Sequence, residues 1–221
     1  MVELITGLRA EVVRENLERV RTQIVDAGRD PESVQVLAAV KYVPVEELGV
    51  LAEAGVTLVG ENRAQDLVAK AEAHPGVFTW DFIGHLQSRK VKQVLPHVRY
   101  IETVASDSAL ERLGRHGSPE TEILVEVNVA GEEGKSGIAP EELPAFLERC
   151  PAKAVGLMTM PPFASDPEAS RPHFAALREL AAEHDLPHLS MGTSQDYVVA
   201  VQEGATIVRL GSTLYRPTGQ S

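Results

Sequence analysis

Short apolar runs alternate with amphipathic segments along almost the whole chain, and this alternation limits the available folds more than any other feature. Eight runs have the length and β-branched content of buried strands, at residues 34–40, 56–60, 80–84, 98–102, 122–129, 154–159, 188–192 and 206–211. Segments of helical character separate them, at residues 45–54, 63–73, 89–95, 108–115, 141–149, 171–184 and 194–203. The pattern predicts an α/β protein with a TIM-like (β/α)8 barrel. A doubly wound open sheet uses the same elements and is the alternative.

An extra helix precedes the first predicted strand. Its apolar stripe recurs every three to five residues, at Leu8, Val12, Leu17, Val20 and Ile24. Gly28 follows as a typical helix stop. No linker, repeat or low-complexity segment divides the chain, and the proline-rich residues 160–172 are predicted to form a loop inside the domain. We therefore predict a single domain over residues 1–221.

The charge balance excludes several partners. The chain has 32 acidic and 21 basic residues and a formal net charge of -11, so its general field repels nucleic acid and anionic lipid. No apolar run approaches the ~20 residues of a membrane span, and residues 1–13 carry acids where a signal peptide carries basic residues. Histidine and cysteine show no metal-site spacing. We expect a cytoplasmic protein without a metal that contacts neither nucleic acid nor membrane.

Polar residues stand at the ends of the predicted strands. Barrels of this kind place their chemistry at the carboxyl ends of the strands. Lys41 ends the first predicted strand, Asn62 follows the second and His85 follows the third. We predict that these side chains converge at one mouth of the barrel.

Two glycine and hydroxyl turns follow the seventh and eighth predicted strands. They are "SMGTSQD", residues 190–196, which runs into a helix, and "RLGST", residues 209–213. Backbone N–H groups at a helix start, with hydroxyls and a nearby arginine, suit a phosphate, and these barrels bind phosphate after strands seven and eight. Together the turns predict a phosphorylated ligand. The alternative is that Gly192 and Gly211 are ordinary turn glycines and that Ser194 caps a helix.

A phosphate site near Lys41 suggests a chemical role for this lysine. An ε-amine partly desolvated at the barrel mouth is disfavoured as an ammonium, and the free amine can form a Schiff base with an aldehyde. Pyridoxal 5′-phosphate (PLP) carries both an aldehyde and a phosphate. We therefore predict PLP held by Lys41. The alternative is a solvent-exposed lysine without a chemical role, since lysines are rarely buried.

The chain also resembles a known family. Six stretches carry the resemblance: "AAVKY", "VGENRAQD", "FIGHLQSRKVK", "VNVAGEEGKSGI", "GLMTMPPF" and "LSMGTSQDYVVAVQEGATIVRLGSTLY". Together they closely resemble the pyridoxal phosphate homeostasis protein family, over residues 34–215. This family is similar in fold to the barrel of alanine racemase, which is PLP fold type III.

The resemblance implies a set of cofactor-binding residues. Lys41 resembles the Schiff-base lysine, and Arg209 resembles the arginine that faces the pyridine nitrogen. The other implied residues belong to the two phosphate turns or line the cofactor pocket: Ser190, Met191, Gly192, Ser194, Gly211 and Ser212 in the turns, and Asn62 and His85 in the pocket.

The resemblance further implies binding of PLP without substantial turnover. A racemase needs two bases on opposite faces of its substrate, and Lys41 serves one face. The chain ends before the domain that supplies the opposing tyrosine in the racemases. We expect a monomeric carrier or regulator that contacts PLP-dependent apoenzymes transiently. Two alternatives stay open: a small amino-acid racemase or lyase with Tyr42 or His85 as second base, and a phosphate-ligand or protein-binding module without covalent chemistry.

Overall fold

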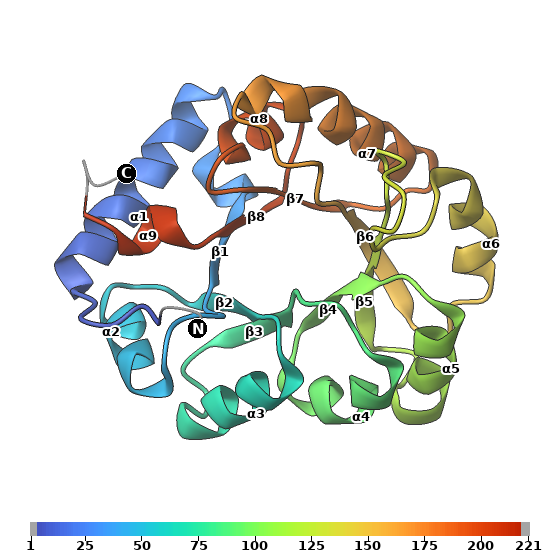
Figure 1. Cartoon of the computed structure of the whole chain (residues 1–221), viewed down its shortest axis with the longest axis horizontal. Coiled ribbons are helices and arrows are strands. Elements are labelled where there is room, and N and C mark those ends of the chain that lie inside the picture. Colours follow the sequence, from blue (N-terminus) through green and yellow to red (C-terminus); the bar gives the residue numbers. More distant parts are fainter. Residues whose placement is uncertain (1–3, 218–221) are drawn as a thin grey trace.

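The computed structural model describes residues 4–217, and their strands close into one parallel barrel in the order β1-β2-β3-β4-β5-β6-β7-β8 (Figure 1). The strands are β1 Gln35–Ala39, β2 Leu58–Glu61, β3 Thr79–Phe82, β4 Tyr100–Val104, β5 Glu122–Glu126, β6 Lys153–Met158, β7 His188–Thr193 and β8 Ile207–Leu210. Because β1 pairs in parallel with β8, with Gln35 opposite Ile207, the barrel is closed. The predicted (β/α)8 barrel is confirmed, and the open-sheet alternative is wrong.

Helices surround the barrel on its outside (Figure 1). They are α1 Ala10–Asp26, α2 Leu48–Glu53, α3 Ala64–Ala73, α4 Val91–Val94, α5 Asp107–His116, α6 Leu143–Glu148, α7 Arg171–Glu183, α8 Tyr197–Gln202 and α9 Ser212–Tyr215. Helices α2, α4 and α6 are shorter than predicted because 3₁₀ turns precede them, at Val45–Glu47, Ser88–Lys90 and Pro140–Glu142, and α8 is shorter because it begins only at Tyr197. The short helix α9 was not predicted. Within residues 4–217, no helix combines the length and the apolar character needed to cross a membrane.

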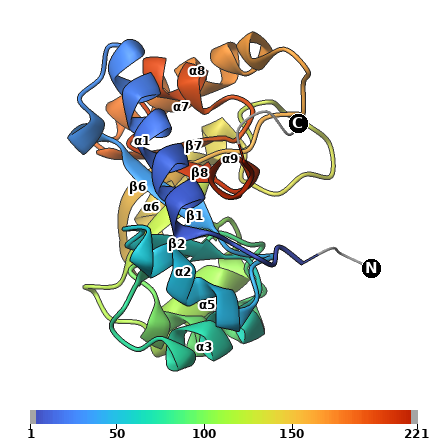
Figure 2. The same ribbon diagram turned by 90° about the vertical axis from the view of Figure 1, so that its left-hand side faces the viewer.

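The predicted N-terminal helix is confirmed as α1. It buries Val13, Leu17 and Val20, and Gly28 follows it with a positive φ of 84°. The helix lies beside α9 (Figures 1 and 2), where the Asn16 amide donates to the carbonyls of Leu214 and Arg216, both at 2.9 Å. Residues 1–3 and 218–221 lie outside the described residues, so the single domain over residues 1–221 stays a prediction.

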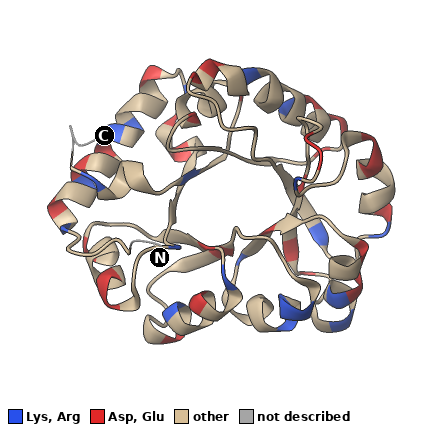
Figure 3. Cartoon of the chain, viewed as in Figure 1, with Lys and Arg blue, Asp and Glu red and all other residues tan. Residues whose placement is uncertain are grey.

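The interior of the barrel changes from apolar to charged toward the carboxyl ends of the strands. The apolar layer inside it consists of Leu37, Leu58, Tyr100, Leu124, Val155, Met158 and Ile207. Two residues further along their strands come the buried side chains of Glu102, Glu126 and Arg209. Many other charged residues lie on the surrounding helices (Figure 3). The buried charges therefore lie at the end of the barrel where its loops carry the predicted site.

Candidate ligand site at the carboxyl ends of the strands

Lys41 lies in a turn, two residues beyond the end of β1. Its Nζ lies over the ring of Tyr42, 4.8 Å from the ring centroid. The side chain is exposed. The expected partial desolvation of this amine is therefore not found, because the strand ends at Ala39 and the turn carries the lysine past the last paired residues.

Two buried side chains fix the backbone that leads to Lys41. Lys70 Nζ donates to the carbonyl of Val40 at 2.7 Å, and the hydroxyl of Tyr215 donates to the carbonyl of Ala39 at 3.1 Å. Burial raises the pKa of the Tyr215 phenol, so it stays a hydroxyl donor at neutral pH. The end of β1 is thus held in place although the Lys41 side chain is exposed to solvent.

Lys70 forms a buried ion pair with Glu61 at the end of β2. The Nζ to Oε2 distance is 2.5 Å, and the side chains are only 6% and 0% exposed. The other oxygen of Glu61 accepts from the backbone N–H groups of Asn62 and Arg63, at 2.7 and 3.2 Å. Because every oxygen of this carboxylate has a donor, the buried charge is compensated.

The two predicted turns after β7 and β8 contact each other through Ser194. Its Oγ accepts from the backbone N–H groups of Gly211 and Thr213, at 3.2 and 3.4 Å. The Thr213 hydroxyl donates back to the Ser194 carbonyl at 3.4 Å. Ser194 is therefore no cap of the following helix, whose N-cap position is held by Asp196. The two turns form one polar surface beside β1.

The remaining predicted turn residues have different surroundings. Gly192 has a φ of +90°, and a Cβ there would lie 2.6 Å from Cβ of Ala200, so packing of α8 requires glycine. Met191 is fully buried in the large hydrophobic core cluster that also holds Leu189. This cluster is separate from the apolar layer inside the barrel. Its side chain therefore does not line the polar surface between the turns. Ser212 is exposed at the first residue of α9.

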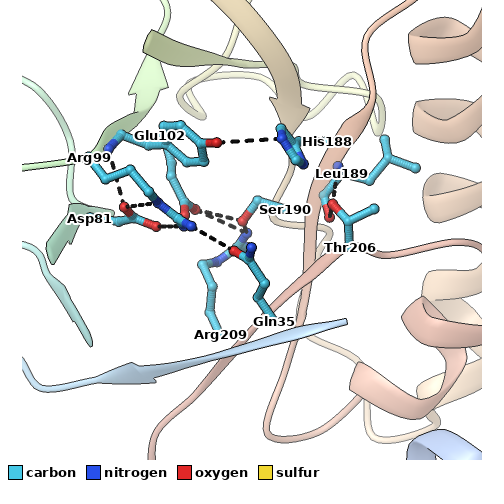
Figure 4. Close-up of polar contacts among 10 residues, drawn as sticks. Gln35, Asp81, Arg99, Glu102, His188, Leu189, Ser190, Thr206 and Arg209 are labelled. Atoms are coloured by element: carbon cyan, nitrogen blue, oxygen red, sulfur yellow. Dashed lines mark hydrogen bonds and ion pairs between the residues drawn. The ribbon is translucent and has the colours of Figure 1, made fainter. Parts of the chain in front are cut away.

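Arg209 and Ser190 lie inside the barrel and contact each other (Figure 4). The Arg209 guanidinium donates to Ser190 Oγ at 2.6 Å and to the carbonyl of Thr159 at 2.9 Å. The Ser190 hydroxyl in turn donates to Glu102 Oε2 at 2.6 Å. Arg209 thus links β8, β7 and the end of β6. Ser190 is engaged in this buried cluster, away from the hydrogen bonds that join the two turns.

The surroundings of Glu102 favour the protonated form of its carboxyl group. Burial, together with the nearby Asp81 carboxylate, raises the pKa of Glu102 to about 8, and Arg209 only partly opposes this. Of these two carboxyl groups, Asp81 is the one that pairs closely with a cation, because Arg99 donates to both of its oxygens at 3.1 and 2.6 Å (Figure 4). Glu102 Oε1 has no hydrogen-bond partner among the described residues.

Replacing Glu102 by glutamine should flatten the pH dependence of stability. In the folded protein its pKa is raised from 4.5 to about 8, so the folded state keeps a proton that the unfolded chain releases. The free energy of unfolding therefore falls as the pH rises through this window, by up to roughly 1.4 kcal/mol per pH unit. Glutamine stays neutral and removes this contribution. Urea unfolding of both proteins at about pH 5 and about pH 8 measures the difference; an equal decline in the variant would contradict the assignment.

Asn62 and His85 lie together, at a different part of the rim. Both line a cavity of about 530 Å³ at the ends of β2 and β3. Asn62 Oδ1 is buried there and has no hydrogen-bond partner among the described residues, and His85 is exposed. Neither Lys41 nor the two turns line this cavity. The predicted residues thus form two groups, one at β1, β7 and β8 and the other at β2 and β3.

Two buried charged residues behind the rim, Lys70 and Glu102, were not predicted from the sequence. Lys70 lies on the same face of α3 as Ala64 and Leu67, which are also buried. Glu102 interrupts an apolar strand. A lysine on an apolar helix stripe and a carboxylate inside a buried strand are unusual, because charged groups are rarely buried without a partner. These positions were the signal in the sequence.

The barrel and its rim define the class of the protein. This is the architecture of the alanine racemase N-terminal domain, whose family model matches residues 9–218. A protein of Aquifex aeolicus is 39% identical over 213 residues, covering 90% of this chain and 93% of its own, and a Homo sapiens protein is 34% identical over 227 residues, covering 90% and 82%. Both are named pyridoxal phosphate homeostasis protein, and this chain belongs to that family.

Solved structures show the same relationship. PipY of Synechococcus elongatus, solved with PLP bound, is 30% identical with a TM-score of 0.79, covering 92% of this chain and 100% of its own. A protein of Bifidobacterium adolescentis is 32% identical with a TM-score of 0.83, covering 97% and 98%. Lysine decarboxylase of Selenomonas ruminantium is 16% identical with a TM-score of 0.71, covering 94% and 62%, and shares the fold alone.

Proposed function

We propose that the protein binds PLP as a Schiff base on Lys41 and acts in the homeostasis of this cofactor, without substantial turnover of amino acids. The observation that carries the proposal is the register of β1 and β8, which pairs Ala38 with Leu210. Lys41 and the turn at residues 211–213 therefore leave neighbouring strands at the same edge of the barrel. PLP bound to PipY, at 30% identity, supports the same ligand here.

The polar surface between the turns fits a phosphate. The N–H groups of Gly211 and Thr213 share a single hydroxyl acceptor, Ser194 Oγ, at 3.2 and 3.4 Å. A phosphate oxygen is a better acceptor than a hydroxyl, because hydrogen bonds to charged groups are shorter and stronger. The two N–H groups would hold the phosphate, and the Ser194 hydroxyl would turn to donate to it.

Lys41 suits a carrier because its amine is exposed. When bound, the cofactor supplies an aldehyde carbon that a free primary amine attacks. Lys41 must lose its proton first, and the ring of Tyr42 orients the amine beside the rim. An exposed attachment point also lets the cofactor leave, as transient contact with PLP-dependent apoenzymes requires. The monomeric state stays a prediction.

The surroundings of Lys41 argue against a second base. Tyr42 belongs to the same turn and contacts the amine itself. His85 lines the separate cavity at β2 and β3. Because racemisation needs acid and base groups on opposite faces of the substrate, neither arrangement supplies the pair. The racemase alternative therefore rests on the fold alone.

Proton exchange at Cα tests the absence of turnover. We expect the cofactor-loaded protein, incubated with L-alanine in deuterated buffer, to exchange the Cα proton slowly and to form no D-alanine, because one base returns the proton to one face. NMR follows the deuterium and chiral chromatography follows the isomers. Sustained formation of D-alanine that disappears in Lys41→Ala would contradict the carrier and favour the racemase.

A further inference from the structure

A polar cavity of about 530 Å³ lies outside the barrel mouth, between the start of α3 and the segment that joins β3 to α4. Its volume is in the range of small-molecule sites. Phe82 and Ala64 supply apolar lining, and three glutamines, Gln65, Gln87 and Gln93, supply amide groups. The cavity therefore has both a size and a polarity that suit a small hydroxylated ligand.

The charges that line this cavity are all basic. They are those of Arg63, Arg89 and Lys90, and the imidazole of His85 lines the cavity beside them. Arg89 and Lys90 are held by the neutral amides of Gln87 and Gln93, at 3.1 and 3.2 Å. Among residues 4–217, neither cation pairs with a carboxylate, and only Arg63 has one nearby, with Asp66 at 3.8 Å. The lining of the cavity is therefore locally positive, although the chain has a formal net charge of -11.

Two further groups at the cavity lack partners. Helix α3 begins here with no side-chain cap, so the N–H groups of its first turn, including Ala64 and Gln65, have no partner within the helix. The buried amide oxygen of Asn62 is also unpaired within the described part of the chain. The carboxylates nearest in sequence are both paired, Glu61 with Lys70 and Asp66 with Arg63. Asp66 in the first turn offsets part of the positive end of the helix, while Arg89 and Lys90 have no carboxylate partner among the described residues.

We propose that this cavity binds a small phosphate ester with a hydroxylated organic part, noncovalently and separately from the site at Lys41. The phosphate lies at the start of α3, between Arg63 and the cations of Arg89 and Lys90, and the glutamine amides bind the hydroxyl groups. A helix N-terminus beside two cations that lack a carboxylate partner suits a dianion better than a single carboxylate.

Titration of ¹⁵N-labelled protein with glycerol 3-phosphate tests the proposal by NMR. We expect saturable shifts of the amides of Ala64 and Gln65, with no such shifts on titration with glycerol. The amides of Gly211 and Thr213 report the site near Lys41 in the same spectra. The two sites are therefore separable: silence at Gly211 and Thr213 would count against the proposed function and leave this inference standing.

Variants decide whether the cavity cations bind the ligand. The double replacement Arg89→Ala and Lys90→Ala should raise the dissociation constant at Ala64 about tenfold or more, and Arg63→Ala, at a largely exposed position, gives a second variant if the first does not fold. Lys92→Ala is the matched control, since Lys92 lies on α4, is exposed and does not line the cavity. Absence of saturable shifts, or an equal loss in Lys92→Ala, would overturn the proposal.

Discussion

Replacement of Lys41 by alanine is expected to abolish covalent binding of PLP completely. A Schiff base needs a primary amine, and the register of β1 and β8 brings this amine to the edge that carries the proposed phosphate site. Wild-type protein incubated with PLP and reduced with borohydride should carry a pyridoxyl group on the peptide that spans residue 41. The variant should show neither this adduct nor the visible absorbance band of the bound cofactor.

Two controls separate covalent chemistry from charge. Lys41→Arg keeps a cation that can stack on the ring of Tyr42, but its guanidinium forms no Schiff base, so the adduct should be lost as in Lys41→Ala. Lys135→Ala, in the loop after β5, should retain both band and adduct. An adduct of wild-type yield on another lysine of the Lys41 variants would show that the assignment is wrong.

Replacement of Lys70 by methionine should lower the free energy of unfolding by about 3–5 kcal/mol, the usual cost of removing one partner of a buried ion pair. Glu61 would remain buried with an uncompensated charge, and the carbonyl of Val40 would lose its donor. Urea unfolding measures the loss. Since Val40 directly precedes Lys41, the variant should also bind PLP more weakly.

The double variant Glu61→Gln with Lys70→Met is the control for that prediction. Without the carboxylate no buried charge is left unpaired, so the double variant should recover much of the stability lost in Lys70→Met. The exposed pair Arg115 and Glu111 provides the comparison, and Arg115→Met should cost less than about 1 kcal/mol. Equal losses at the buried and exposed pairs would contradict a special role for Lys70.

The fold was predictable from the sequence because each of its units carries a local pattern. The strands and the helices between them follow from runs of apolar residues and from helical periodicity, and α1 follows from a stripe that ends before Gly28. The short helix α9 was missed because four residues are too few for a periodic pattern. The 3₁₀ turns before α2, α4 and α6 were included in the predicted helices, since both kinds of helix start with similar residues.

The site was predictable only in part. The glycine and hydroxyl residues of the turns after β7 and β8 can be identified directly in the sequence. The position of these two turns on adjacent strands follows from the barrel topology. The exposure of Lys41 depends on where β1 ends, which sequence gives only to within a few residues. The partners of Arg209, which are Ser190 and the carbonyl of Thr159, depend on the stagger between strands, and no local pattern encodes this stagger.

Closure of the barrel by β1 and β8 has a consequence for synthesis. The strand β1 leaves the ribosome before the other strands of the barrel, yet its partner Leu210 is translated some 170 residues after Ala38. Until then β1 has only β2 beside it, and its other edge stays open. The hydrogen bond from the Asn16 amide to the carbonyl of Leu214 likewise forms only after Leu214 has been translated. This edge of the nascent barrel therefore needs protection until β8 is translated, and the proposed phosphate site is completed only with this last strand of the barrel.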